Sequence, residues 1–273
     1  MLISTFAFSL MQLCVKFLSH LPTSELVFFR SIISLTLSLS YLLHIKVNPL
    51  GNNRKWLMLR GIFGVTALYM FFTTLQNIPL ASAVTLQYLS PVFTAVIAIF
   101  LLKEKVRPPQ WFFFFLAFFG VAIMKGFDQR MDWIYFFLGI GSAFFAGLAY
   151  NSIRKVKDTD HPVVVVMYFP MIATPIMGIW SYFNWVMPGG WDWLWILLLG
   201  LFTQAGQIFM TKALQAEEAN KVASLKYLGT VYALLYGYLF FDEGFQWISL
   251  MGMSLVLLGV VLNIRYKTLK AEA

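Results

Sequence analysis

The sequence predicts an all-α integral membrane protein whose ten transmembrane helices form two inverted repeats of five helices each. Three observations lead to this prediction. The 273 residues are 60% hydrophobic and only 12% charged, whereas roughly 25% of the residues of a soluble domain are charged. Ten apolar runs follow one another along the chain, and each is close to the roughly 20 residues that cross a bilayer as a helix. The two halves of the chain also match each other at a constant offset.

The apolar runs lie between charged residues and glycine or proline breaks. In the first half we expect spans at residues 2–19, 24–45, 55–74, 80–102 and 109–123. In the second half we expect them at 133–151, 162–186, 191–211, 220–241 and 245–264. This division predicts one repeat over residues 1–131 and a second over 132–273. The first run has neither a basic segment before it nor a small-residue cleavage site after it, so we expect a retained span.

Basic residues gather at alternate ends of the predicted spans. If the N-terminus is cytoplasmic, the outer loops contain only Lys125 and Arg130. The inner loops and the C-terminal tail then contain Lys46, Arg54, Lys55, Lys103, Lys105, Arg107, Arg154, Lys155, Lys157, Lys212, Lys221, Arg265, Lys267 and Lys270. The positive-inside rule describes this asymmetry. We therefore expect a multi-pass protein of the cell membrane with both termini in the cytoplasm.

Composition and motifs exclude several other classes of protein. The formal net charge is +8, but the basic residues are scattered at span ends rather than collected in a nucleic-acid-binding patch. Cys14 is the only cysteine, so neither an internal disulfide nor a CxxC motif can form. No phosphate-binding loop or HExxH motif is present, and Asp158, Asp160 and His161 favour a metal site only weakly. We expect no cofactor and no catalytic site.

The chain matches itself when it is shifted by 139 positions, a shift that we call the repeat offset. Gln76 then aligns with Gln215, Tyr88 with Tyr227, and Glu104 with Glu243. Because each repeat has an odd number of spans, the second repeat enters the membrane from the opposite side. Inverted repeats can pack in two nearly equivalent ways, one open to each side, with the substrate site near the midplane. This property favours a carrier that works by alternating access.

Short motifs recur in the same order in both halves. The first half contains LVFFRS at 26–31, LASAVTLQYLSPVFT at 80–94 and LKE at 102–104, and the second contains ASLKYLG at 223–229 and FDE at 241–243. Together they resemble the EamA type of the drug/metabolite transporter superfamily over essentially the whole chain, although the N-terminus is shorter than is usual there. The resemblance implies ten helices in two inverted bundles, a central cavity, and export or exchange of metabolites. It also implies a relation to the solute carriers that include nucleotide-sugar carriers.

Charges inside the predicted spans are the first candidates for a site, because charge in hydrocarbon is costly. Arg30 and Lys226 each lie about two turns into a span, whereas aspartate and glutamate fall only at span ends. The buried charge is therefore expected to be positive and to favour anionic solutes such as carboxylates, amino acids or nucleotide-like compounds. The absence of a mid-span carboxylate favours uniport or exchange over proton-driven export. Either cation could instead have a structural role.

Polar side chains on facing spans complete the candidate site. The repeat pairs Gln87 with Lys226 and Tyr88 with Tyr227 at mirrored depths. The predicted substrate-binding residues are Arg30, Gln87, Tyr88, Tyr150, Asn151, Gln204, Gln207, Lys226 and Tyr227. Neutral amides bridge helices as readily as they bind ligands, and most tyrosines simply pack.

The sequence thus predicts a secondary transporter of a small metabolite, in contact with the lipid bilayer and a small-molecule substrate and acting as a monomer or homodimer. Two alternatives remain. A membrane-embedded lipid-modifying enzyme would need convergent acid, base or metal groups near the interface, and none is found in the sequence. A channel would pass solute without saturation, whereas a carrier saturates.

Overall fold

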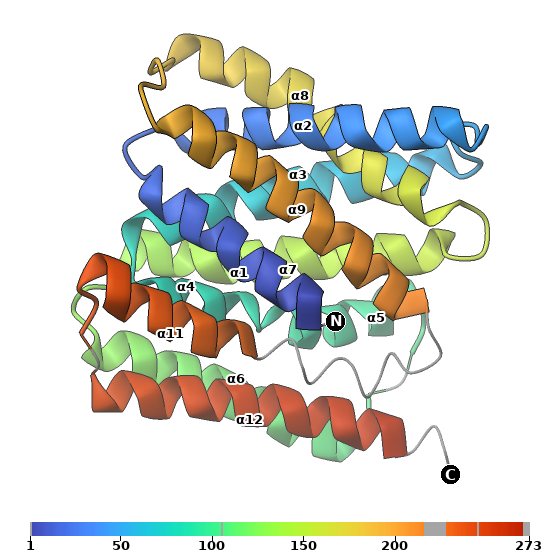
Figure 1. Cartoon of the computed structure of the whole chain (residues 1–273). Helices are drawn as coiled ribbons and strands as arrows, with labels where there is room; N and C mark the ends of the chain where they lie inside the picture. The colour runs from blue at the N-terminus through green and yellow to red at the C-terminus, as the bar shows by residue number, and fades with distance from the viewer. Residues whose placement is uncertain (1, 105, 216–227, 245, 270–273) are drawn as a thin grey trace.

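The computed structural model describes residues 2–104, 106–215, 228–244 and 246–269 (Figure 1). Within these ranges the chain forms helices and no strand. The helices run roughly parallel or antiparallel to one another (Figure 1). They are α1 (Leu2–Phe17), α2 (Thr23–His44), α3 (Arg54–Asn77), α4 (Leu80–Gln87), α5 (Ser90–Leu101), α6 (Pro108–Phe127), α7 (Trp133–Val156), α8 (Pro162–Phe183), α9 (Asp192–Gln215), α11 (Leu228–Phe241) and α12 (Trp247–Leu269).

These helices confirm the predicted fold class. Eight of the described stretches are long and apolar enough to cross a membrane, with α4 and α5 together making one of them. The other two are the shorter apolar helices α1 and α11. The start of the predicted ninth span, residues 220–227, lies outside the described residues. The protein is therefore an all-α membrane protein with ten transmembrane helices.

The fourth span differs from the prediction because it is broken rather than continuous. Helix α4 ends at Gln87, a turn follows at Tyr88 and Leu89, and α5 begins at Ser90. Pro91 explains the break, since proline has no N–H to donate to the carbonyl of Gln87 four residues earlier. At the second position of α5 that missing donor costs nothing. Several other ends differ from the prediction by up to five residues.

The same chain reversal ends α5 and α11, at opposite ends of the molecule. Lys103 and Asp242, which are related by the repeat offset, both have positive φ, at 56° and 51°. The amide of Glu104 donates to the carbonyl of Ala98 at 3.2 Å, and that of Glu243 donates to Gly237 at 3.0 Å. Because both donors and both acceptors are also related by the repeat offset, the two turns are equivalent parts of the two repeats.

Contacts between helices of the two halves also occur in pairs that are related by the repeat offset. Gly61 of α3 packs on Ile172 of α8, and Gly200 of α9 packs on Ile33 of α2. Shifting Gly61 and Ile33 by the repeat offset gives the other two residues, so one contact is the inverted copy of the other. Glycine lets these helix backbones approach closely, as is common in membrane bundles. The two repeats are thus interlocked by equivalent contacts.

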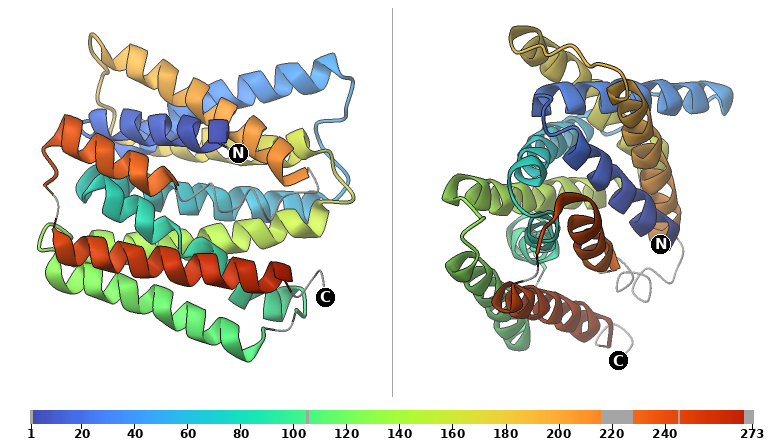
Figure 2. Two further views of the ribbon diagram at one scale, coloured as in Figure 1. Left: turned by 60° about the horizontal axis from the view of Figure 1, so that its bottom comes forward. Right: turned by 60° about the vertical axis from the view of Figure 1, so that its left-hand side comes forward.

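Helices α6 and α12 lie side by side at one edge of the molecule (Figure 2). Gly120 of α6 packs on the carbonyl of Gly252, and Gly259 of α12 packs on the carbonyl of Phe113. These two contacts are also exchanged by the repeat offset. The fifth helices of the two repeats therefore meet around the same pseudo-two-fold relation as the others.

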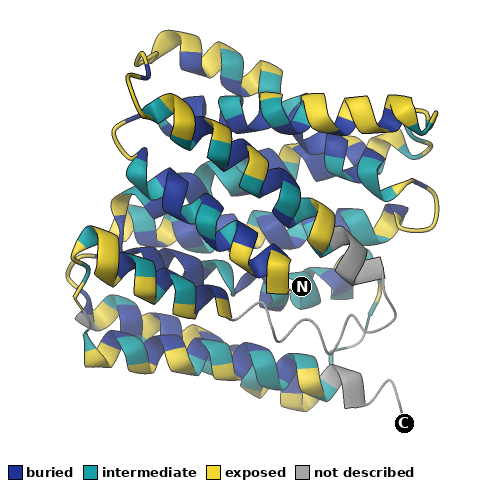
Figure 3. Cartoon of the chain, in the orientation of Figure 1, coloured by how far each residue is buried: buried dark blue, intermediate teal, exposed yellow. Residues whose placement is uncertain are grey.

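Figure 3 shows which parts of the helices are buried and which are exposed. Polar side chains are among the buried residues, and many large apolar side chains are exposed. Large apolar side chains are exposed on outward helix faces, including Phe112, Phe115 and Phe119 of α6. Lipid would cover such faces in a membrane, where the helices satisfy their own backbone hydrogen bonds. Buried serine, threonine and arginine side chains occur inside the bundle. The interior is where a polar solute could be recognised.

Candidate substrate site at the pseudo-two-fold axis

Arg30 lies in the second turn of α2 and is only 4% exposed. Its Nε donates a hydrogen bond to Oγ1 of Thr203 on α9 at 3.0 Å. Its guanidinium carbon lies 4.9 Å from the centre of the Phe169 ring on α8. Cation–π attraction and one hydrogen bond thus hold the side chain between three helices.

The contact between Arg30 and Phe169 locates the symmetry axis of the molecule. The two residues are related by the repeat offset, so they occupy equivalent places in the two repeats. Equivalent residues that touch each other must lie beside the axis that relates them. In inverted repeats this axis runs in the plane of the membrane, and substrate sites lie near the midplane where the repeats meet. Arg30 therefore lies beside the axis where the two repeats meet, which makes it a candidate for solute binding.

A second arginine shares the Phe169 ring. Arg60, the seventh residue of α3, is 9% exposed, and its guanidinium carbon lies 5.7 Å from the ring centre. One of its terminal nitrogens packs against Gly64, where a larger residue would collide with it. Tyr150 of α7 is close enough to interact electrostatically with it. Arg60 was not among the residues expected from the sequence, although it too lies inside a predicted span.

Neither arginine has an acidic partner among the described residues. The ion pairs found there join Lys16 to Glu243, His20 to Asp192, Arg130 to Asp128 and Arg154 to Glu104. Nη1 of Arg30 and Nε of Arg60 are buried without a hydrogen-bond partner. Burying a cation without a counter-charge costs roughly several kcal/mol of folding free energy. The arrangement can therefore bind an anion, which would supply both missing interactions.

At the end of the molecule on the left of Figure 1, an ion pair ties the two repeats together. Nζ of Lys16 on α1 lies 3.1 Å from Oε1 of Glu243, in the turn after α11. Lys16 also donates to the carbonyl of Ile78 at 2.7 Å. Oε2 of Glu243 accepts from the amide of Leu80 at 2.8 Å, so it caps the first turn of α4. We call Lys16, Glu243 and their two backbone partners the distal clamp.

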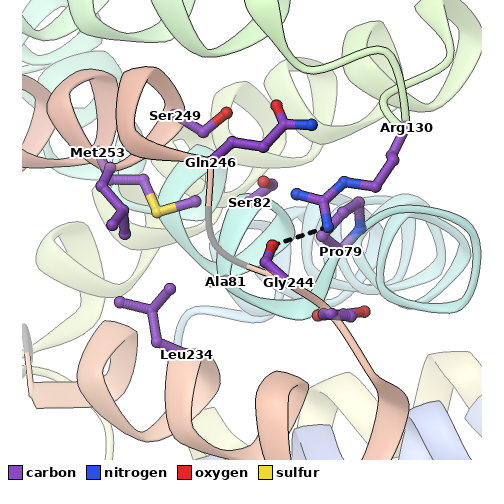
Figure 4. A pocket seen from close by; sticks show the side chains of 11 residues that line it. Pro79, Ala81, Ser82, Arg130, Leu234, Gly244, Gln246, Ser249 and Met253 are labelled. Carbon is purple, nitrogen blue, oxygen red and sulfur yellow. Dashed lines mark hydrogen bonds between the residues drawn. The ribbon is translucent and has the colours of Figure 1, made fainter.

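A small cavity of about 20 Å³ adjoins the distal clamp (Figure 4). Ser82, Arg130, Glu243 and Ser249 are among its lining residues, and Arg130 donates to the carbonyl of Gly244 at 3.0 Å across it. Such a volume holds about one water molecule. The cavity is therefore part of a closed end rather than a place for a metabolite.

The opposite end, on the right of Figure 1, carries the equivalent ion pair. Arg154 at the end of α7 pairs with Glu104 in the turn after α5. Glu104 and Glu243 are related by the repeat offset, and Arg154 lies one position before the repeat mate of Lys16. We call this pair the basic-end clamp, because Lys46, Arg54, Lys103 and Lys155 lie at the same end. Each clamp joins the first helix of one repeat to the turn after the fourth span of the other.

Comparison with known proteins agrees with the repeat and the fold. The model of the EamA-like transporter family matches residues 1–125 and again 133–265. The chain belongs to the EamA-like transporter family. This EamA transporter is 31% identical over 272 residues to the pseudopaline exporter CntI of Pseudomonas aeruginosa (strain UCBPP-PA14), covering 97% of this chain and 94% of the relative. It is 32% identical to the human solute carrier family 35 member G1, covering 90% and 72%.

Two further comparisons extend this result. A riboflavin transporter of Vibrio cholerae is 24% identical over 284 residues, covering 100% of this chain and 94% of the relative. A solved crystal structure with 17% sequence identity has a TM-score of 0.64 and covers 98% of both chains, which shows a shared fold. The EamA transporter is therefore a multi-pass membrane transporter of a small molecule, and not an enzyme.

Two predicted site residues of the EamA transporter bridge helices in the structure. Oε1 of Gln204 accepts from Ser34 at 2.6 Å, and Nε2 of Gln204 donates to Ser38 at 3.2 Å, which ties α9 to α2. Nδ2 of Asn151 donates to the carbonyl of Thr94 at 3.0 Å, which ties α7 to α5, and to the carbonyl of Gly147 within α7 at 3.0 Å. These bonds correspond to the helix-bridging alternative that the sequence left open for neutral amides.

Gln87 and Tyr88 lie at the break between α4 and α5. Oε1 of Gln87 accepts a hydrogen bond from Ser142 of α7 at 2.8 Å. The Tyr88 hydroxyl packs against Gly229 at the start of α11, where any side chain would collide with it. Their repeat mates Lys226 and Tyr227 lie outside the described residues. The structure thus places Gln87 and Tyr88 at a helix break that contacts both repeats.

Two candidates predicted from the sequence remain, Tyr150 and Gln207. Tyr150 of α7 lies within electrostatic range of Arg60. Gln207 is half-buried on α9, one turn beyond Thr203. The structure therefore brings Arg30 and the unexpected Arg60 together around Phe169. In the sequence, each of the two arginines interrupts an apolar run, and this pattern indicates a candidate site residue.

Proposed function

We propose that this EamA transporter is a secondary carrier that moves a small solute with an anionic group by alternating access, as a uniporter, exchanger or exporter. Carboxylates, amino acids and nucleotide-like compounds are the solute classes considered. The observation that carries the proposal is the buried guanidinium of Arg30 beside the pseudo-two-fold axis, with a buried donor that has no partner. An anion bound there would pair with a charge that no described residue neutralises.

The two clamps support alternating access. In an alternating-access cycle the carrier opens to one side while the other side is sealed. The distal clamp and the basic-end clamp lie at opposite ends, and each joins one repeat to the other. Rocking the repeats about the arginine site would break one clamp and leave the other closed. The channel alternative needs no such pair of closures.

The distribution of basic residues supports an orientation. We propose that the basic end, where α2 and α7 finish, faces the cytoplasm of the cell membrane, because cytoplasmic loops carry an excess of lysine and arginine. The distal clamp then faces outward, and both termini are cytoplasmic.

Transport by the purified protein in liposomes tests the proposal. Arg30→Gln should lower the rate of anion uptake by about 10- to 100-fold, since a hydrogen bond between charged groups contributes roughly 1.5–3 kcal/mol. Arg30→Lys keeps the charge and should retain part of the rate. Arg265→Gln, the same change at an exposed position of α12, is the matched control. Wild-type uptake by Arg30→Gln, or faster transport of cations than of anions, would contradict the proposal.

A further inference from the structure

Two buried arginines, Arg30 and Arg60, contact the same Phe169 ring. We infer that the site selects solutes with two negative charges, such as a dicarboxylate or a phosphate monoester, and that Arg60 supplies the second charged contact. This inference rests on the proposed function, because it assumes that the solute binds at Arg30. It narrows the solute class and assigns a specificity-determining role to a residue on α3.

Geometry brings the two guanidinium groups into one small region. The carbon of Arg30 lies 4.9 Å, and that of Arg60 5.7 Å, from the centre of the same Phe169 ring. Each arginine keeps one buried nitrogen without a hydrogen-bond partner, Nη1 in Arg30 and Nε in Arg60. The two free donors belong to α2 and α3, so one solute could be held by both helices.

No described acid is placed to neutralise this double charge. The buried carboxylates are Glu25, Asp128 and Asp160. Glu25 accepts from the amide of Val186, Asp128 pairs with Arg130, and Asp160 accepts from the amides of residues 52 and 53. Each of them lies near a helix end and makes at least one interaction there, although Oε1 of Glu25 has no hydrogen-bond partner. Because like charges in a poorly solvated site repel each other, the ligand is the natural source of the counter-charge.

A solute with two negative charges satisfies both arginines, whereas a monoanion leaves one buried cation unpaired. A zwitterionic amino acid would also bring an ammonium group close to a guanidinium, which is unfavourable. The ring of Phe169 is close to both charges and is an apolar surface that the carbon skeleton linking the two anionic groups could contact. Among the three solute classes considered, amino acids therefore match this arrangement least.

Matched pairs of small anions test the inference on the purified full-length protein. Succinate and succinamate share a skeleton but differ by one negative charge, as do methyl phosphate and dimethyl phosphate. Binding is measured at pH 8 by ligand-induced thermal stabilisation, and transport by competition in liposomes. We expect at least one dianion to bind tenfold or more tightly than its monoanionic mate, and the preferred pair separates carboxylate from phosphate recognition. Tenfold corresponds to about 1.4 kcal/mol.

The variant Arg60→Gln should abolish this preference, so that both members of the pair bind with similar, weak affinity. Arg60→Lys should restore part of the preference, and Arg265→Gln should leave it unchanged. Without ligand, Arg60→Gln should also unfold at a higher temperature than the wild type, because an unpaired buried charge has been removed. A purely structural arginine would give the opposite shift.

Several outcomes would overturn the inference. Equal binding of monoanions and dianions by the wild type, or no binding of any of the four anions, contradicts it. A preference that persists in Arg60→Gln, or a lower unfolding temperature of that variant, also contradicts it. If the wild type carries both kinds of anion equally and Arg30→Gln stops both, the proposed function stands and only this inference fails. Transport of cations alone would overturn both.

Discussion

The two clamps are built from equivalent positions, yet their surroundings differ. In the distal clamp the side chains of Lys16 and Glu243 are 13% and 15% exposed, and both also bond to the backbone between α3 and α4. In the basic-end clamp the side chains of Arg154 and Glu104 are 36% and 35% exposed. Ion pairs close to water contribute little, whereas removing one partner of a buried pair is costly. The distal end is therefore the more firmly closed.

A second interaction strengthens this asymmetry. Arg130 forms an ion pair with the fully buried Asp128 and donates to the carbonyl of Gly244, next to Glu243. The hydrogen bonds to Asp128 raise the pKa of Arg130 above its ordinary value. The repeat mates of Asp128 and Arg130 are Lys267 and Leu269, two residue types that cannot form an ion pair. The two ends are thus held by unequal sets of interactions. Under the proposed alternating access, this difference would bias the balance between the two open states.

The largest effect is expected from breaking the distal clamp. Glu243→Gln keeps an acceptor for the amide of Leu80 but removes the charge that pairs with Lys16. The expected cost is about 2 kcal/mol, less than the roughly 3–5 kcal/mol of a fully buried pair because both side chains keep some exposure. The state open at the distal end should gain about thirtyfold in population.

A reporter cysteine measures this change. Ser82 is fully buried and lines the cavity beside Glu243 (Figure 4). In a Cys14→Ser, Ser82→Cys background, Glu243→Gln should raise the labelling rate by a membrane-impermeant maleimide added to intact cells. Exchanging the charges, with Lys16→Glu and Glu243→Lys together, should slow labelling only in part, because the ion pair returns without the hydrogen bonds to the backbone of Ile78 and Leu80. No increase in labelling would show that the pair does not close this end or that this end faces the cytoplasm.

The basic-end clamp should respond more weakly and in the opposite direction. Glu104→Gln removes an ion pair worth about 0.5 kcal/mol, which favours opening at the basic end and should slow labelling at Ser82→Cys by about twofold. In high salt this effect should vanish, because exposed pairs are screened, while that of Glu243→Gln persists. If Glu104→Gln instead accelerates labelling, the clamps are only general supports of the fold.

Much of this fold follows from the sequence, because lipid imposes helices of a fixed length and the polar positions 76, 88 and 104 recur at the repeat offset. The interruption of the fourth span is less predictable, since a proline such as Pro91 can bend a helix or end it. The roles of Asn151 and Gln204 depend on which neighbours lie within reach, which spacing along one helix does not reveal. Arg60 could have been predicted as a candidate by the reasoning applied to Arg30, because both are charges inside a span. That both arginines contact the Phe169 ring could be seen only in the structure.

The smallest effect is expected when one clamp is given the chemistry of the other. Arg154→Lys makes the basic-end pair a lysine–glutamate pair like the distal one and keeps the charge. It gives up only the fork geometry of arginine, including the 3.5 Å contact with Asn151. Labelling at Ser82→Cys should therefore change by well under the factor of about two expected for Glu104→Gln. Arg154→Gln, in contrast, should reproduce the full effect of Glu104→Gln. A large effect of Arg154→Lys would mean that guanidinium geometry rather than charge closes the basic end, and that burial alone does not explain the difference between the two clamps.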